Sequence, residues 1–145
     1  MIRKFVEILS EQTRLLNNLV TLASVLHKSL LNYDTPMIEK VTVKQDEVIA
    51  MISAQEEDRL NLIMEWLKLD RMEANNLRLS TIERNLNGRA KEIVSELKSK
   101  ISSLNAELEK LNRENRILAN KARYSVSNIL HMLSSDHNAM CNVQV

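Results

Sequence analysis

Apolar residues recur every three or four positions along most of the chain, and this spacing predicts amphipathic α-helices. The longest run covers about residues 88–133, where the a and d positions of a heptad repeat stay apolar over about six heptads. Its members are Ala90, Val94, Leu97, Ile101, Leu104, Leu108, Leu111, Leu118, Ala122, Ile129 and Met132. No glycine or proline follows Gly88, so we predict one continuous helix, about 45 residues and about 68 Å long.

Two shorter helices are predicted before it, over about residues 4–33 and 36–69. In the first, the apolar positions form two adjacent lines, and the resulting stripe is wide enough to contact two neighbouring helices. The first line is Phe5, Ile8, Leu15, Leu19, Leu22 and Leu26, and the second is Leu9, Leu16, Ala23 and Leu30. The second helix has one seam, in which Gln45, Gln55 and Arg59 either set the register or pair with polar neighbours.

A short connection is predicted where helix-capping residues meet the only proline of the chain. Asp34 or Thr35 is suited to cap the second helix, and Pro36 fits its first turn, where the missing N–H costs nothing. A connection this short places the two helices antiparallel and adjacent. Over residues 70–88 the apolar period weakens, and we interpret this segment as a connector with one or two helical turns.

The expected fold is all-α: an antiparallel three-helix bundle or coiled coil, formed by residues 1–145 as a single domain. The first two helices would span about 44 and 51 Å, which is shorter than the third. About ten to fifteen residues at the end of the third helix therefore pass beyond the bundle. Their exposed apolar strip is typical of a partner-binding or self-association site. After Leu133 the pattern is lost, and a flexible tail is expected over residues 134–145.

Composition and charge exclude several functional classes. The formal net charge is +1, with 20 Lys and Arg against 19 Asp and Glu, which argues against a general nucleic-acid-binding protein. No apolar run is long enough to span a membrane, and residues 1–5 lack the apolar core of a signal peptide. Cys141 is the only cysteine, so the simple interpretation is a reducing compartment. We therefore expect a cytoplasmic protein without stable membrane insertion.

The chemistry-bearing side chains do not predict an enzyme, a metal site or a cofactor. With one glycine the chain has no phosphate-binding loop, and it lacks paired-cysteine and HExxH metal-binding spacings. Glu56, Glu57 and Asp58 lie at different angles around a helix, so a solvated face is a simpler interpretation than acid–base catalysis. His137 and Cys141 stand four residues apart in the tail, where a metal site would need further ligands.

The heptad helix contains an asparagine-containing motif. Residues 111–118 read Leu-Asn-Arg-Glu-Asn-Arg-Ile-Leu and are followed by Ala-Arg-Tyr at 122–124 and by Ile129-Leu130. This sequence resembles the C-terminal helix of FlgN-type flagellar export chaperones. Asp34 at the first turn and the segment 77–82 before the long helix also resemble the family. The resemblance covers nearly the whole chain.

The resemblance implies a cytoplasmic, non-enzymatic chaperone of flagellar type III secretion. Such chaperones bind the C-terminal segments of hook–filament junction proteins, prevent their premature assembly and deliver them to the membrane export gate with its ATPase complex. The partner-binding residues predicted here are Asn115, Arg116, Tyr124, Ile129, Leu130 and Leu133. Asn115 lies on the a/d seam, so a buried asparagine that sets the register is an equal alternative to a client contact.

Two other functions are compatible with the same pattern. A structural coiled-coil protein would self-associate through the exposed strip, for instance as a homodimer, without an export role. A nucleic-acid-binding helical domain would use the basic residues between Arg113 and Arg123, but Glu114 stands among them and Tyr124 is the single aromatic nearby. We therefore expect protein partners and no nucleic acid.

Overall fold

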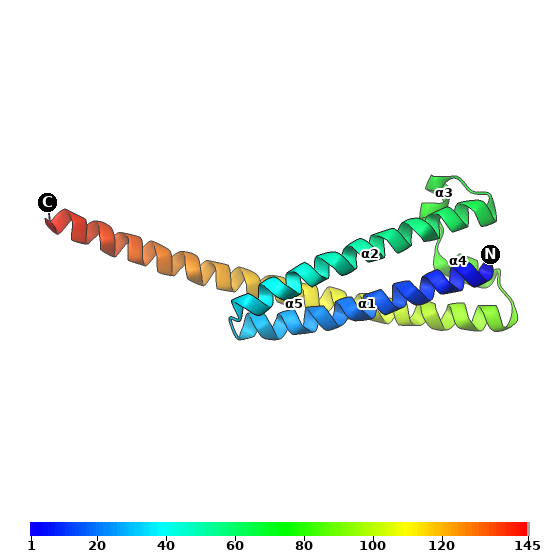
Figure 1. Ribbon diagram of the computed structural model, residues 1–145, viewed down its shortest axis with the longest axis horizontal. Helices are drawn as coiled ribbons and strands as arrows, with labels where there is room; N and C mark the ends of the chain where they lie inside the picture. Colours follow the sequence, from blue (N-terminus) through cyan, green and yellow to red (C-terminus); the bar gives the residue numbers. More distant parts are fainter. Residues whose placement is uncertain (145) are drawn as a thin grey trace.

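The computed structural model describes the backbone of residues 1–144 and the side chains of residues 1–134 (Figure 1). Within those residues it has no strand, and the all-α prediction is confirmed. The helices are α1 (Ile2–Leu31), α2 (Thr35–Leu67), α3 (Arg71–Asn76), α4 (Leu79–Arg84) and α5 (Gly88–Gln144).

Helix α5 is longer than the heptad pattern predicts. It has 57 residues and continues to Gln144, whereas the apolar pattern stops near Leu133. At a rise of about 1.5 Å per residue it is about 86 Å long. The side chains of residues 135–145 lie outside the described part of the chain. The side chains of the expected flexible tail, including His137 and Cys141, fall there. The flexibility of the tail stays a prediction.

The turn between α1 and α2 is short, and a side chain caps the second helix. The Oδ1 atom of Asp34 accepts a hydrogen bond from the backbone N–H of Met37 at 3.3 Å. Pro36 lies in the first turn of α2, where its missing N–H leaves no hydrogen bond unmade. The two helices fold back on each other as an antiparallel hairpin (Figure 1).

Helix α1 is the central helix of the bundle, because it packs against both α2 and α5. It is antiparallel to α2 and parallel to α5: Phe5 shares a core cluster with Val94, and Ala23 is bonded to Asn115 further along both helices. Among the described residues, no Cα atom of α2 lies within 8 Å of a Cα atom of α5. The bundle is therefore open between these two helices. This opening follows from the apolar patterns of the helices. The wide apolar stripe of α1 contacts two neighbouring helices, whereas α2 has a single apolar seam.

The main core lies where α1 begins and α2 ends, and the short helices α3 and α4 close it. Its buried members are Phe5, Leu9, Leu60, Leu62, Ile63, Ala74, Ile82 and Val94, drawn from all five helices. The rings of Phe5 and Trp66 are 5.7 Å apart between centroids in a tilted arrangement that aromatic pairs favour. At this end α3 packs against α2 and α4 packs against α5.

Ion pairs and a glycine fix the connector between α2 and α5. Arg71 in α3 pairs with Glu57 in α2, with 2.6 Å between Nη1 and Oε1, and Lys98 in α5 pairs with Glu83 in α4. Gly88 has a φ of +61°, a left-handed conformation that glycine adopts without steric cost, and α5 begins there. These contacts attach both short helices to the long ones.

Candidate partner-binding strip

The interface between α1 and α5 contains a buried asparagine. Asn115 is 5% exposed, and its Nδ2 donates to the backbone oxygen of Ala23 at 2.9 Å. Its Oδ1 lies 3.1 Å from Nδ1 of His27. Because Nδ2 faces Ala23, Oδ1 is the acceptor of the second bond and His27 donates from Nδ1. Asn115 therefore occupies the buried, register-setting position that its place on the seam allows.

Beyond Asn115, the cover that α1 gives to this side of α5 ends within about two turns. Leu118 and Ala122 are half-buried, whereas Ile129 on the same seam is 56% exposed. Helix α1 ends at Leu31, and α5 continues well past the turn between α1 and α2 (Figure 1). We define the apolar strip as the exposed large apolar side chains of this segment: Ile117, Tyr124, Val126, Ile129, Leu130, Met132 and Leu133.

The predicted partner-binding residues divide into two groups. Tyr124, Ile129, Leu130 and Leu133 are exposed on the protruding part of α5, whereas Arg116 is exposed next to Asn115, where α5 still runs along α1. Asn115, discussed above, is the one member that lies inside the bundle. The structure therefore places four of the six on one uncovered segment, and the contact of all six with a partner stays a prediction.

The strip is flanked by cations. Arg116, Lys121 and Arg123 are exposed, and residues 115–134 contain no Asp or Glu. In the heptad of the seam, Asn115, Ala122 and Ile129 are a positions, so Lys121 lies at g, directly beside the seam, and Arg116 and Arg123 lie at b, on the outer flank. Whatever covers the strip meets positive charge at its edge.

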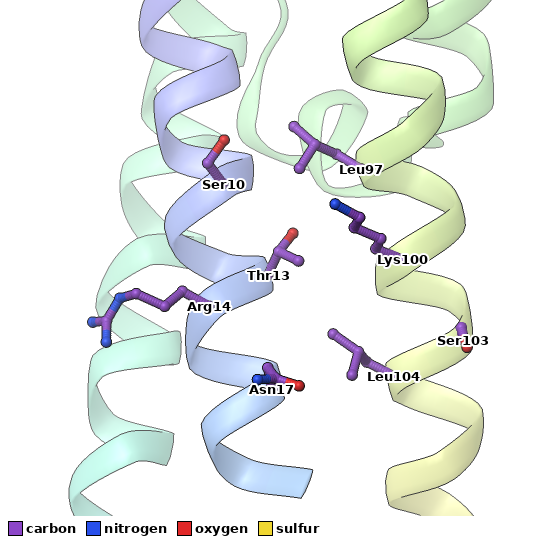
Figure 2. A pocket seen from close by; sticks show the side chains of 8 residues that line it. All are labelled: Ser10, Thr13, Arg14, Asn17, Leu97, Lys100, Ser103 and Leu104. Atoms are coloured by element: carbon purple, nitrogen blue, oxygen red, sulfur yellow. The ribbon is translucent and has the colours of Figure 1, made fainter. Parts of the chain in front are cut away.

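A groove of about 500 Å³ separates α1 and α5 along the middle of the bundle (Figure 2). Its lining residues are Ser10, Thr13, Arg14 and Asn17 from α1 and Leu97, Lys100, Ser103 and Leu104 from α5. Leu97, Lys100 and Leu104 point toward α1, whereas Arg14 points away from α5. Arg14 pairs with Glu11 instead, with 2.6 Å between Nη2 and Oε1. The lining has no carboxylate, thiol or imidazole.

Two carboxylates of residues 56–58 make contacts within the bundle. Glu56 accepts a hydrogen bond from Nε2 of Gln12 at 2.9 Å and pairs with Arg59, as the sequence allows. Glu57 is hydrogen-bonded to Arg71, which lowers the pKa of Glu57 from its ordinary value of 4.5. Asp58 is exposed on α2, so only Glu56 and Glu57 of this run make contacts within the bundle.

Metal binding and membrane spanning find no support in the described part of the chain. No three His, Cys, Asp or Glu side chains within it gather closely enough to hold a metal ion. None of its helices combines the length and the hydropathy that crossing a bilayer demands.

The family comparison agrees with this arrangement. The family model described as FlgN protein matches residues 1–142, nearly the whole chain. The chain belongs to the FlgN family. FlgN proteins are flagellar export chaperones and not a family of enzymes, so the resemblance seen in the asparagine-containing motif is confirmed. No curated protein and no solved structure matches the chain.

Proposed function

We propose that this FlgN chain binds the C-terminal helices of hook–filament junction proteins through the apolar strip of α5. The observation that carries the proposal is the side of α5 that α1 covers as far as Leu118 and Ala122 and that then continues uncovered. A client helix laid along this face would bury apolar side chains that neither protein covers alone. The client's own assembly face would be occupied at the same time, so it would not assemble prematurely.

The place of the strip also supports delivery of the client. A helix held on the protruding part of α5 leaves the sides of α1 and α2 uncovered, so the bundle remains accessible to a second partner. We propose that this second partner is the export gate or its ATPase complex, and that the chaperone meets both in the cytoplasm. The handover needs no cofactor and no stable insertion into the membrane.

The first test replaces Ile129 and Leu130 with Asp in one variant. Both side chains are more than half exposed, so the thermal melting of the bundle should change little. Burial of two aliphatic side chains contributes about 3 kcal/mol or more, so affinity for a junction-protein segment should fall at least about a hundredfold. Isothermal titration of the full chain with a purified C-terminal segment of a junction protein measures the affinity, and circular dichroism measures the melting.

The matched control places the same charges on another exposed apolar surface. Val43 and Ile49 in α2 are 58% and 48% exposed, and their double change to Asp should leave client binding intact.

A truncated chain that ends at Asn120 lacks most of the strip, so it should fail to bind the client, as the I129D/L130D variant should. If I129D/L130D unfolds, its two residues belong to the core and the strip is wrongly placed. If the wild-type chain ignores every segment and self-associates through the strip, the structural coiled coil is the better account.

A further inference from the structure

The interface between α1 and α5 is incompletely filled at the last turn of α1. Ala23 is bonded to Asn115 and the two helices run parallel, so Leu31 lies level with about residue 123 of α5. Leu31 follows His27 by four residues, a spacing that places both side chains on one face of α1. His27 contacts Asn115 from this face, whereas Leu31 is 54% exposed. The last turn of α1 therefore presents an apolar side chain on its α5 side that the described chain leaves more than half uncovered.

The turn after α1 holds a tyrosine in an unfavourable backbone conformation. Tyr33 has a φ of +53°, a left-handed conformation that Gly, Asn and Asp adopt at lower cost. Its side chain is 73% exposed, so packing within the chain does not explain an aromatic residue at this position. Backbone strain of this kind concentrates at functional sites, and an exposed tyrosine offers both apolar surface and a hydroxyl group to a partner.

Leu31 and Tyr33 stand where the uncovered part of α5 begins. Helix α1 covers the seam of α5 as far as Leu118 and Ala122, and α5 then continues past the turn (Figure 1). Ile129 lies on the same seam as Ala122. A helix bound over Ile129 would therefore follow α1 along one side of α5, and its end would meet the turn between α1 and α2.

Resting on the function proposed above, we infer that this turn is the end wall of the client site. The end of the client helix that lies nearest the bundle packs against Leu31 and Tyr33, which extend the apolar strip around its near end. An apolar seam alone permits a bound helix to shift by whole heptads. The wall removes that freedom, so it fixes how far along α5 the client lies.

Photocrosslinking tests the contact directly. A benzophenone amino acid takes the place of Tyr33 in one full-length chain and of Leu130 in another, and each chain is mixed with a purified C-terminal segment of a junction protein. Mass spectrometry then locates the crosslinked client residues. Position 33 should capture one end of the client helix, and position 130 should capture residues about two turns further along it. The same amino acid at Ile49, an exposed position of α2, is the control and should capture no client.

The outcomes separate this inference from the proposed function. Capture of the client at position 130 but not at position 33 would overturn the end wall and leave the proposed function in place. Capture at neither position would contradict the proposed function and the inference together. Capture of only a second copy of the chain at position 33 would assign the turn to self-association and overturn the inference.

A double variant tests the two side chains. Leu31→Ala with Tyr33→Asn removes their apolar surface and places a residue that tolerates positive φ in the turn. Its affinity for the client segment should fall about tenfold in isothermal titration. Its melting temperature should stay close to that of wild type, because relief of backbone strain offsets the loss of leucine contacts.

The matched control makes the same kind of change at the other end of α2. Leu67 is 40% exposed, and Lys68 after it has a φ of +55°. Leu67→Ala with Lys68→Asn should keep the wild-type affinity. An unchanged affinity in L31A/Y33N, or an equal loss in both variants, would overturn the inference.

Discussion

Asn115 shows how one buried polar residue can fix the register of two packed helices. Its amide is satisfied by the backbone oxygen of Ala23 and by the ring of His27, and both lie in α1. Leucine seams alone tolerate shifts by one heptad, whereas a buried asparagine with fixed partners does not. The register that Asn115 sets therefore determines which residues of α5 lie beyond α1.

The stability of this contact is measurable by truncation. Asn115→Ala leaves the Nδ1 donor of His27 without its acceptor in a half-buried place, so the free energy of unfolding should fall by about 1–3 kcal/mol. Asn112→Ala, one turn earlier and exposed, is the control and should change it by less than about 0.5 kcal/mol. Urea denaturation measures both. Equal effects in the two variants would mean that the bonds of Asn115 contribute nothing.

At this scale the sequence indicated the position of Asn115 but not its partners. The heptad placed Asn115 on the seam, where burial was one of two options. His27 is 88 residues away in the chain, and its spacing carries no periodic signal that could connect it to α5. Only the packing of α1 against α5 brings the two side chains together.

Among the elements, α1 was the most predictable and the connector the least. The two apolar lines of α1 implied two neighbours, and the helix does pack between α2 and α5. Helices α3 and α4 have six residues each, which is too short for a 3.6-residue period to be recognised. Their closure of the core depends on Ala74 and Ile82, single residues whose burial no local pattern indicates.

The ion pairs of the connector predict how stability depends on pH. Hydrogen bonds from Arg71 and Lys98 lower the pKa of Glu57 and Glu83 from the ordinary value of 4.5. A carboxyl group with a lowered pKa in the folded state stabilises the fold above its unfolded pKa, and this contribution is lost as pH falls through the lowered value. The melting temperature should therefore decrease as pH is lowered from about 5 to about 3.

Substitutions separate the contribution of Glu57 and Glu83 to this pH dependence from that of the other acidic residues. Glu57→Gln with Glu83→Gln should lower the melting temperature at neutral pH and flatten its decrease in acid. Glu65→Gln, at an exposed position of α2, should leave the wild-type profile in place. Identical pH profiles for the double variant and wild type would show that the pairs do not hold the connector helices.

For the whole molecule, a mismatch of helix lengths has the largest consequence. The sequence predicted the mismatch, because the heptad run of the last helix was longer than the two apolar patterns before it. It did not predict the opening between α2 and α5, since periodicity gives the width of an apolar stripe and not the angle between neighbours. The protruding segment of this FlgN protein presents an uncovered apolar seam, and we propose that the client binds there.

Hydrogen–deuterium exchange of the full chain, with and without a junction-protein C-terminal segment, tests the central claim most directly. Bound client should slow amide exchange in the peptides that cover about residues 117–133, because a helix laid on the strip suppresses local opening there. The account predicts that α1 and α2 exchange at the same rates in both samples, apart from the turn that joins them. Protection confined to α1 and α2, with residues 117–133 unchanged, would contradict it and place the client on the bundle.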